Sequence, residues 1–279
     1  MRNPFLKWVI VLHNGGIGCK VPLAKTTGSS KGLYHYICPY SMTSYFQHII
    51  YHATRSSLSP AISIGKQSIT YSELIGSAAQ VAQQIQVKNQ NIGLYTDNNL
   101  DMYISLLAIW ISGNAYVPLN HKFPVDRLMK IIDESEIEII LSSDPSQSTL
   151  SDIQDKHWIV PQYNRSLSID IPNITFSQKA YTLFTSGSTG APKGIPITHG
   201  NLEALMIDLL ERYPLNANHK VLQAFELSFD VSIACVLIAL TQGAHLVVAD
   251  LNGITAINAF KAIHESQVDF VVLPPSALF

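Results

Sequence analysis

Residues 181–194 read Tyr181-Thr-Leu-Phe-Thr-Ser-Gly-Ser-Thr-Gly-Ala-Pro-Lys-Gly194. Six consecutive residues of this stretch are only Thr, Ser or Gly, and Lys193 follows them closely. Glycine amides that turn inward, hydroxyl donors and a lysine are the groups that bind a polyphosphate. Composition alone favours a flexible linker, but strand-like apolar segments on both sides and the rigid Pro192 favour a shaped loop. Phosphate binding is therefore one of two readings that the spacing leaves open.

The loop differs from the P-loop of nucleoside triphosphatases. A P-loop has Gly directly before its lysine and Ser or Thr directly after it, so that a hydroxyl reaches Mg²⁺. In this chain Pro192 precedes Lys193 and Gly194 follows it. The spacing excludes a P-loop, and any phosphate site here must have another architecture.

The ten residues 185–194 resemble the signature loop of the adenylate-forming superfamily, whose members include acyl-CoA synthetases, luciferase-like enzymes and adenylation domains of nonribosomal peptide synthetases. Residues 68–74, residues 113–119 with Pro124 and Arg127, and residues 229–232 resemble further signatures of this family in the same order. The resemblance covers roughly residues 42–279.

The resemblance implies that the loop binds the β- and γ-phosphates of ATP, with Mg²⁺ accompanying the nucleotide. The residues concerned are Thr185, Ser186, Gly187, Ser188, Thr189, Gly190 and Lys193. The family's adenine-binding segment, metal-binding glutamate and catalytic lysine are expected beyond residue 279, so no catalytic residue is assigned in this chain. We expect the chain to be the N-terminal part of the family fold, and expect no ATP–pyrophosphate exchange by residues 1–279 alone.

Composition bounds the class of protein. Of 279 residues, 47% are hydrophobic and 14% charged, which is typical of a globular chain. The net charge of −2 without a basic block argues against a nucleic-acid surface. The cysteines, Cys19, Cys38 and Cys235, have no metal or redox spacing, and no zinc-type cluster is present. No apolar run is long enough to span a membrane, and we expect a cytoplasmic protein without a metal site.

From residue 42 the pattern alternates strands with helices, which favours parallel sheets flanked by helices. We expect an α/β fold with two layered α/β subdomains, at about 42–175 and 176–279, within a partial adenylation domain. Residues 1–41 show no helical or strand period and are expected to be an extension, with Met42 as the natural start. Thr70 and Glu73 form a capping box, and Asn201 is a candidate N-cap for the helix that follows it.

Asp230 is the second candidate site. It lies between an apolar run at 221–225 and a helix expected from about residue 231, at the carboxyl end of a strand where ligands bind in parallel sheets. Asp is also a favoured N-cap, and that reading stays open. In amino-acid-activating members of the family, the aspartate of Phe-Asp-x-Ser holds the substrate's ammonium, which implies this role for Asp230. A buried ammonium needs such a partner.

The resemblance also implies a side-chain pocket lined by Val231, Ala234 and Val272, although ordinary core packing explains each of them equally well. Residues 225–229 lack the histidine that acyl-CoA synthetases usually carry, which favours an amino acid over a fatty or aryl acid. The local sequence is similar to ligases of the D-alanine–carrier-protein type. His199 is interpreted as a structural residue at the start of a helix, and Glu226, near the expected site, as an exposed or hydrogen-bonding residue.

The resulting hypothesis is ATP-dependent activation of an amino acid as an aminoacyl-adenylate. The acyl group would then pass to the phosphopantetheine thiol of a carrier protein. Two alternatives remain open: an acyl- or aryl-acid ligase of the same superfamily, and a non-catalytic nucleotide-binding fragment.

Overall fold

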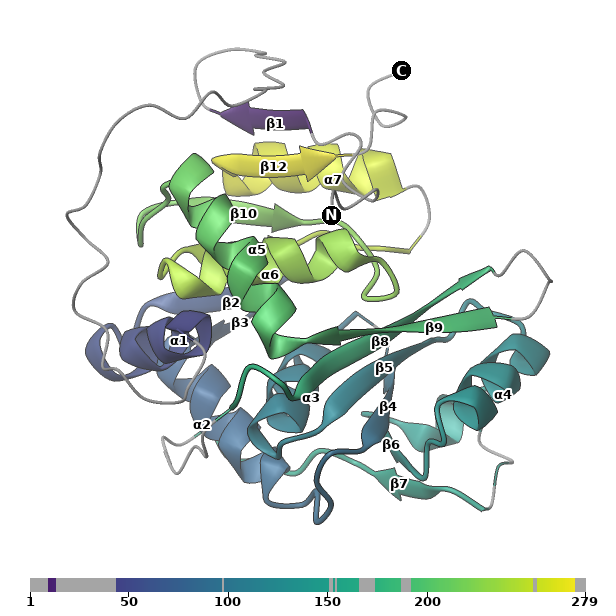
Figure 1. The fold of residues 1–279 in the computed structure, drawn as a ribbon. Helices are drawn as coiled ribbons and strands as arrows, with labels where there is room; N and C mark the ends of the chain where they lie inside the picture. Colours follow the sequence, from purple (N-terminus) through teal and green to yellow (C-terminus); the bar gives the residue numbers. More distant parts are fainter. Residues whose placement is uncertain are drawn as a thin grey trace.

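The computed structural model describes residues 10–13, 44–96, 98–150, 153, 155–165, 174–186, 192–252 and 255–273. These residues form two six-stranded sheets, with helices packed between them and on their outer faces (Figure 1). The α/β fold with largely parallel sheets is confirmed. The loop segment 187–191 and the residues before 10 lie outside the described residues.

One sheet, sheet B, has the strand order β7-β6-β4-β5-β8-β9. The strands from β7 to β8 are parallel to one another, and β9 returns antiparallel to β8. Their bounds are β4 (Asn91–Thr96), β5 (Ala115–Asn120), β6 (Ile139–Leu141), β7 (His157–Ile159), β8 (Lys179–Ser186) and β9 (Pro192–Thr198).

The other sheet, sheet A, has the order β1-β12-β10-β11-β2-β3. Strands β12, β10, β11 and β2 are parallel, whereas β3 and β1 run antiparallel along the two edges. Their bounds are β1 (Ile10–His13), β2 (Pro60–Ile64), β3 (Gln67–Thr70), β10 (Lys220–Gln223), β11 (His245–Val248) and β12 (Phe270–Leu273). No period in the sequence predicts β1.

The two sheets interleave along the sequence. The early strands β2 and β3 belong to sheet A with the late strands, and β8 and β9 belong to sheet B with the early ones. The expected boundary between residues 175 and 176 therefore does not separate one sheet from the other.

The helices are α1 (Ser44–Arg55), α2 (Tyr71–Ala82), α3 (Leu100–Ile111), α4 (Val125–Glu134), α5 (His199–Arg212), α6 (Asp230–Thr241) and α7 (Thr255–Ser266), with a short 3₁₀ helix at Pro145–Gln147. Successive side chains of a strand point to opposite faces of its sheet, so each strand contributes to two apolar layers. On β12, Phe270 and Val272 face the core between the sheets, whereas Val271 and Leu273 face α7. On the outer face of sheet B, Val117 and Leu119 pack in one cluster with residues of α4. Helices thus cover both faces of each sheet.

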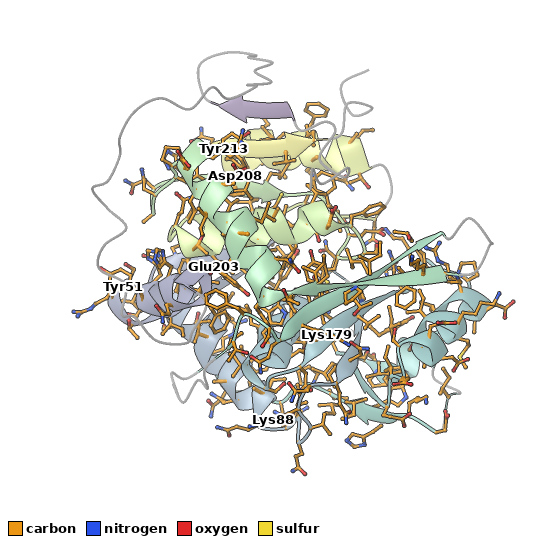
Figure 2. All side chains as sticks on the ribbon, viewed as in Figure 1. Tyr51, Lys88, Lys179, Glu203, Asp208 and Tyr213 are labelled. Atoms are coloured by element: carbon orange, nitrogen blue, oxygen red, sulfur yellow. The ribbon has the colours of Figure 1, made fainter. Side chains whose placement is uncertain are left out.

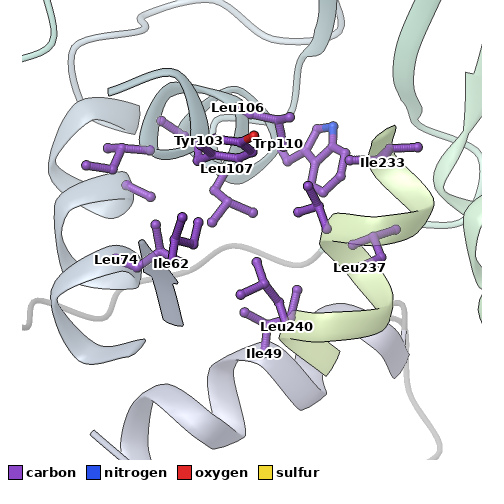
Figure 3. Packing of buried hydrophobic residues seen from close by; sticks show 14 of the residues in the cluster. Ile49, Ile62, Leu74, Tyr103, Leu106, Leu107, Trp110, Ile233, Leu237 and Leu240 are labelled. Atoms are coloured by element: carbon purple, nitrogen blue, oxygen red, sulfur yellow. The ribbon is translucent and has the colours of Figure 1, made fainter. Parts of the chain in front are cut away.

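The core between the sheets is the largest apolar cluster. Figure 3 shows this cluster between the helices: Ile49 of α1 lies beside Leu240 of α6, and Trp110 of α3 lies near Ile233 of α6. Trp110 is fully buried, and its indole Nε1 donates a hydrogen bond to Ala180 O at 2.7 Å. This bond ties α3 to β8, because a buried indole N–H needs an acceptor.

The helix caps test two predictions. The capping box at Thr70 and Glu73 is confirmed, since each side chain bonds to the backbone N–H of the other residue. The prediction of Asn201 as an N-cap is wrong: Thr198 is the N-cap of α5, and Asn201 is the third helical residue. Asn201 completes a second capping box by accepting from Thr198 N at 2.9 Å. The usual capping-box pattern has Glu or Gln at this position, so an asparagine there gives a weaker signal.

In the described part of the chain, the helices are too short or too polar to cross a bilayer.

Candidate active site

The candidate phosphate loop connects β8 and β9. Across this hairpin Thr185 lies opposite Lys193, and Ser186 lies opposite Pro192. The predicted residues Gly187, Ser188, Thr189 and Gly190 lie outside the described residues. The Thr185 and Lys193 side chains are exposed. No ion pair joins Lys193 to any residue that the structure describes, so its ammonium is available to an anion.

Asp230 is the first residue of α6. The N-cap is Phe229, which makes no side-chain cap bond, so the interpretation of Asp230 as the N-cap is wrong. The Asp230 carboxylate is exposed, and no hydrogen bond or ion pair to the described residues holds it. A carboxylate in the first turn of a helix is stabilised by the helix dipole. The hydrogen-bonding capacity of the Asp230 carboxylate is therefore not used by the residues that the structure describes.

Asp230 acts electrostatically on Tyr181 of β8. Burial raises the pKa of the Tyr181 phenol, and the negative charge of Asp230 raises that pKa further. Asp230, at the start of α6, therefore lies within electrostatic range of Tyr181 on β8. Since β8 continues into the candidate phosphate loop, one strand links the two predicted sites.

The three predicted pocket residues lie on two elements. Val231 and Ala234 are half-buried on α6, and Val272 is buried on β12. Val231 and Val272 belong to the same apolar region between the sheets. The geometry is compatible with a pocket wall and equally with core packing, so their role in binding stays a prediction.

A polar network joins the two sheets beside Asp230. Lys122 Nζ lies 2.8 Å from Glu226 Oε1 and donates to Leu251 O at 2.7 Å. Asn120 Nδ2 donates to the other oxygen of Glu226. Next to this network lies a cavity of about 130 Å³, lined by these three side chains and by apolar residues that include Leu94 and Leu227. None of the predicted substrate residues is among those that line it.

His199 is a structural residue. It is buried, its Nδ1 shares a hydrogen bond with the Tyr45 hydroxyl, and the two rings stack with their centroids 6.2 Å apart. Glu203, one turn further along α5 (Figure 2), accepts from Tyr45 N at 3.2 Å. The cluster joins α1 to α5 and keeps His199 away from solvent, in line with the structural role expected for this histidine.

The His199 environment predicts a pH dependence of stability. Burial lowers the pKa of His199 from 6.5 to about 3. Because the unfolded chain binds this proton more readily, the stabilisation is complete above pH 6.5 and is lost as the pH falls toward 3. We expect the free energy of unfolding to fall by about 2 kcal/mol between pH 6.5 and 5 from this group. Urea unfolding at a series of pH values measures it.

The variant His199→Gln should remove the contribution of about one bound proton from the slope of the free energy of unfolding against pH. The control is His264→Gln, at an exposed histidine on α7, which should leave the slope as it is. An unchanged slope in His199→Gln would contradict the assignment of the buried imidazole.

Sequence reasoning missed three groups that the structure brings to this site. Asn120 and Lys122 lie at the end of β5 and just after it, about a hundred positions before Glu226, so no local pattern signals the contact. Tyr181 has the pattern of an ordinary strand residue. Among the residues that the structure describes, no group of three or more His, Cys, Asp or Glu side chains is arranged to hold a metal ion.

Comparison with known proteins agrees with this geometry. The family model described as AMP-binding enzyme matches residues 51–278. Bacitracin synthase 2 of Bacillus licheniformis is 32% identical over 202 residues, covering 69% of this chain and 8% of that protein. The nonribosomal peptide synthetase sidC of Arthroderma benhamiae is 30% identical over 217 residues, covering 75% and 4%. The chain thus spans less than a tenth of these curated relatives.

Solved structures share the fold. The nonribosomal peptide synthetase FmoA3 superposes with a TM-score of 0.71 at 20% identity, over 82% of this chain and 25% of that one. The N-terminal subdomain of Klebsiella oxytoca NpsA gives a TM-score of 0.70 at 21% identity, over 82% of this chain and 61% of that one.

Proposed function

We propose that this chain, which belongs to the AMP-binding enzyme family, is the part of an amino-acid-activating ligase that binds the phosphates of ATP and the ammonium of the amino acid. The observation that carries the proposal is the Asp230 carboxylate. It is exposed in the first turn of α6, no hydrogen bond or ion pair to the described residues holds it, and it lies within electrostatic range of Tyr181 on β8, the strand that leads into the phosphate loop.

The proposed reaction has two halves. In the first, an oxygen of the amino acid's carboxylate attacks the α-phosphorus of ATP. A carboxyl–phosphorus bond forms, the bond to pyrophosphate breaks, and the aminoacyl-adenylate remains. In the second, a phosphopantetheine thiolate of a carrier protein attacks the acyl carbon and AMP leaves. The similarity to a protein named as a nonribosomal peptide synthetase supports this assignment of substrate and partner.

The chain's contribution is positioning and charge neutralisation, because both reactants are anions. Thr185, Ser186, Ser188, Thr189 and the amides of Gly187 and Gly190 would hold the β- and γ-phosphates, and Lys193 would add positive charge. The exposed Thr185 hydroxyl and the unpaired Lys193 ammonium at the hairpin end fit an anionic ligand. Mg²⁺ would arrive with ATP and neutralise its phosphates.

The substrate's side chain would contact Val231, Ala234 and Val272. These residues are small to medium in size and apolar, and we propose a modest apolar amino acid. The reaction chemistry and the cysteine pattern fit the cytoplasm as its location.

Two stable adenylate analogues test the proposal. Alanyl sulfamoyl adenosine and propionyl sulfamoyl adenosine differ only in the ammonium group. Calorimetric titration of the protein that carries this chain should show that one enantiomer of the alanyl analogue binds at least about tenfold more tightly than the propionyl analogue. A charge pair that is buried in the complex contributes at least this much. Equal affinities would favour the acyl-acid ligase instead, and no binding of either would favour a non-catalytic fragment.

A further inference from the structure

The connection from β10 to α6 decides where Asp230 lies, and its helix end is unusual. Phe229, the N-cap, offers no side-chain acceptor to the first turn of α6. Helices normally use a Ser, Thr, Asp or Asn there. The backbone compensates with a turn in which Phe229 N donates to Glu226 O at 3.0 Å, and Ser232 N donates to Phe229 O at 3.1 Å. Glu226 thus opens the turn that ends one residue before Asp230.

The Glu226 side chain is held from the other sheet. Its two carboxylate oxygens accept from Lys122 Nζ and from Asn120 Nδ2, and both donors belong to the end of β5 and the turn after it. Lys122 is fixed further by its bond to Leu251 O, and its backbone N donates to Asn120 Oδ1 at 2.9 Å. Both oxygens of one carboxylate are therefore engaged by two groups, one at the end of β5 and one in the turn that follows it.

A buried residue holds the inner side of the same connection. Gln223 Nε2 donates to Ser232 O at 3.4 Å, and Gln223 Oε1 accepts from Phe225 N at 3.3 Å. These bonds join the end of β10 to the helix within sheet A. On its other side, the same connection is bonded through Glu226 to groups at the end of β5 in sheet B and in the turn after it.

The Lys122–Glu226 pair is partly exposed, with 39% and 27% of the two side chains accessible. Solvent screens such pairs, so their contribution to global stability is small. The pair can still position the Asp230 carboxylate without contributing much to global stability. A small displacement of that carboxylate already weakens a charge-assisted hydrogen bond to a ligand.

We infer that Glu226 is a positioning residue. Anchored by Lys122 and Asn120, it holds the turn before α6 so that Asp230, at the start of that helix, meets the ammonium of the amino acid. The inference rests on the proposed function, and it extends the binding site to two residues of sheet B.

Hydrogen–deuterium exchange of the protein that carries this chain tests the anchoring directly. Glu226→Ala should speed amide exchange in residues 227–232 about tenfold, with a smaller effect for Glu226→Gln, which keeps one acceptor oxygen. Lys122→Met should act in the same direction. Combined with Glu226→Ala it should add nothing within residues 227–232, because the bond between the two side chains is already lost there, and the lost bond from Lys122 to Leu251 O lies outside that segment. The control is Glu265→Ala, in the exposed Lys261–Glu265 pair at 4.0 Å on α7. Unchanged exchange in Glu226→Ala would overturn the inference.

Binding of the two adenylate analogues tests the positioning. Glu226→Ala should weaken the alanyl analogue about tenfold and the propionyl analogue less than about twofold, and Glu226→Gln should restore part of the difference. Equal losses for both analogues would indicate a structural role only and would overturn the inference. If the wild type binds neither analogue, the proposed function fails, and the exchange experiment still decides whether Glu226 anchors the turn.

Discussion

Replacing Asp230 with alanine is expected to weaken binding of alanyl sulfamoyl adenosine by about 30- to 5000-fold. This is the usual range for truncating one member of a hydrogen-bonded charge pair that is buried in the complex, as the exposed Asp230 carboxylate would be once the ligand covers it. The propionyl analogue should keep its affinity within about twofold, because it brings no charge that needs the carboxylate. The reason lies in desolvation: an ammonium that enters a closed site loses its water and needs an anion in exchange. Paired titrations of both analogues measure the effect.

The substitution Asp230→Asn separates charge from hydrogen bonding, since the amide keeps an acceptor oxygen and loses the charge. The affinity of Asp230→Asn for the alanyl analogue should lie between that of the wild type and that of Asp230→Ala. Asp208→Ala is the matched control, at another exposed helical aspartate, paired with Arg212 on α5. Loss of both analogues in Asp230→Ala would contradict the ammonium assignment and indicate that the start of α6 was disturbed.

The second large effect is expected at Gly243, between α6 and β11. Its φ is +72°, and a Cβ there would lie 2.6 Å from the His52 imidazole. Gly243→Ala should lower the free energy of unfolding by about 2–4 kcal/mol, as the sum of left-handed backbone strain and the displaced ring. His52 has little freedom to move, because its Nε2 is hydrogen-bonded to Thr241 O at 3.2 Å. Denaturant unfolding measures the loss.

The chain offers a matched control for this prediction. Gly65, in the β2–β3 turn, has φ +56° and nothing within 4 Å of an added Cβ. Gly65→Ala should therefore lower the free energy of unfolding only by the left-handed backbone strain, about 1 kcal/mol. In the background of His52→Ala, the further loss caused by Gly243→Ala should shrink to that value. Equal losses at Gly65 and Gly243 would contradict the steric argument.

Local sequence signals predict most of the helices and strands, but they predict few of the pairings between strands. The strand at 270–273 and the helix at 101–111 follow from apolar runs and periods, and the structure has them at β12 and α3. Helices α1 and α4 were not predicted, although Leu128, Ile131 and Ile132 have the helical spacing that buries one face of α4. Strand partners were out of reach, since a period of two assigns faces and not neighbours.

The candidate site shows the same limit. A family-like motif sufficed to single out Asp230 and Lys193, because each lies within a short conspicuous pattern. Asn120, Lys122 and Tyr181 became visible only when the fold brought β5 and β8 to the start of α6. Long-range electrostatic contacts depend on topology, and one sequence contains no local trace of them.

Sheet A depends on strand β1, near the start of the chain, to cover one of its edges. Ile10 pairs with Leu273 and His13 with Phe270, so the first strand of the chain covers the outer edge of the last described one. Such a pairing joins the two ends of the described chain and is expected to form late in folding. Until then β12, an apolar strand, presents unpaired N–H and C=O groups that another copy's strand can meet. A protein translated from Met42 would lack β1, so the β12 edge would be open to any other strand that reaches it, from the same protein or from another copy.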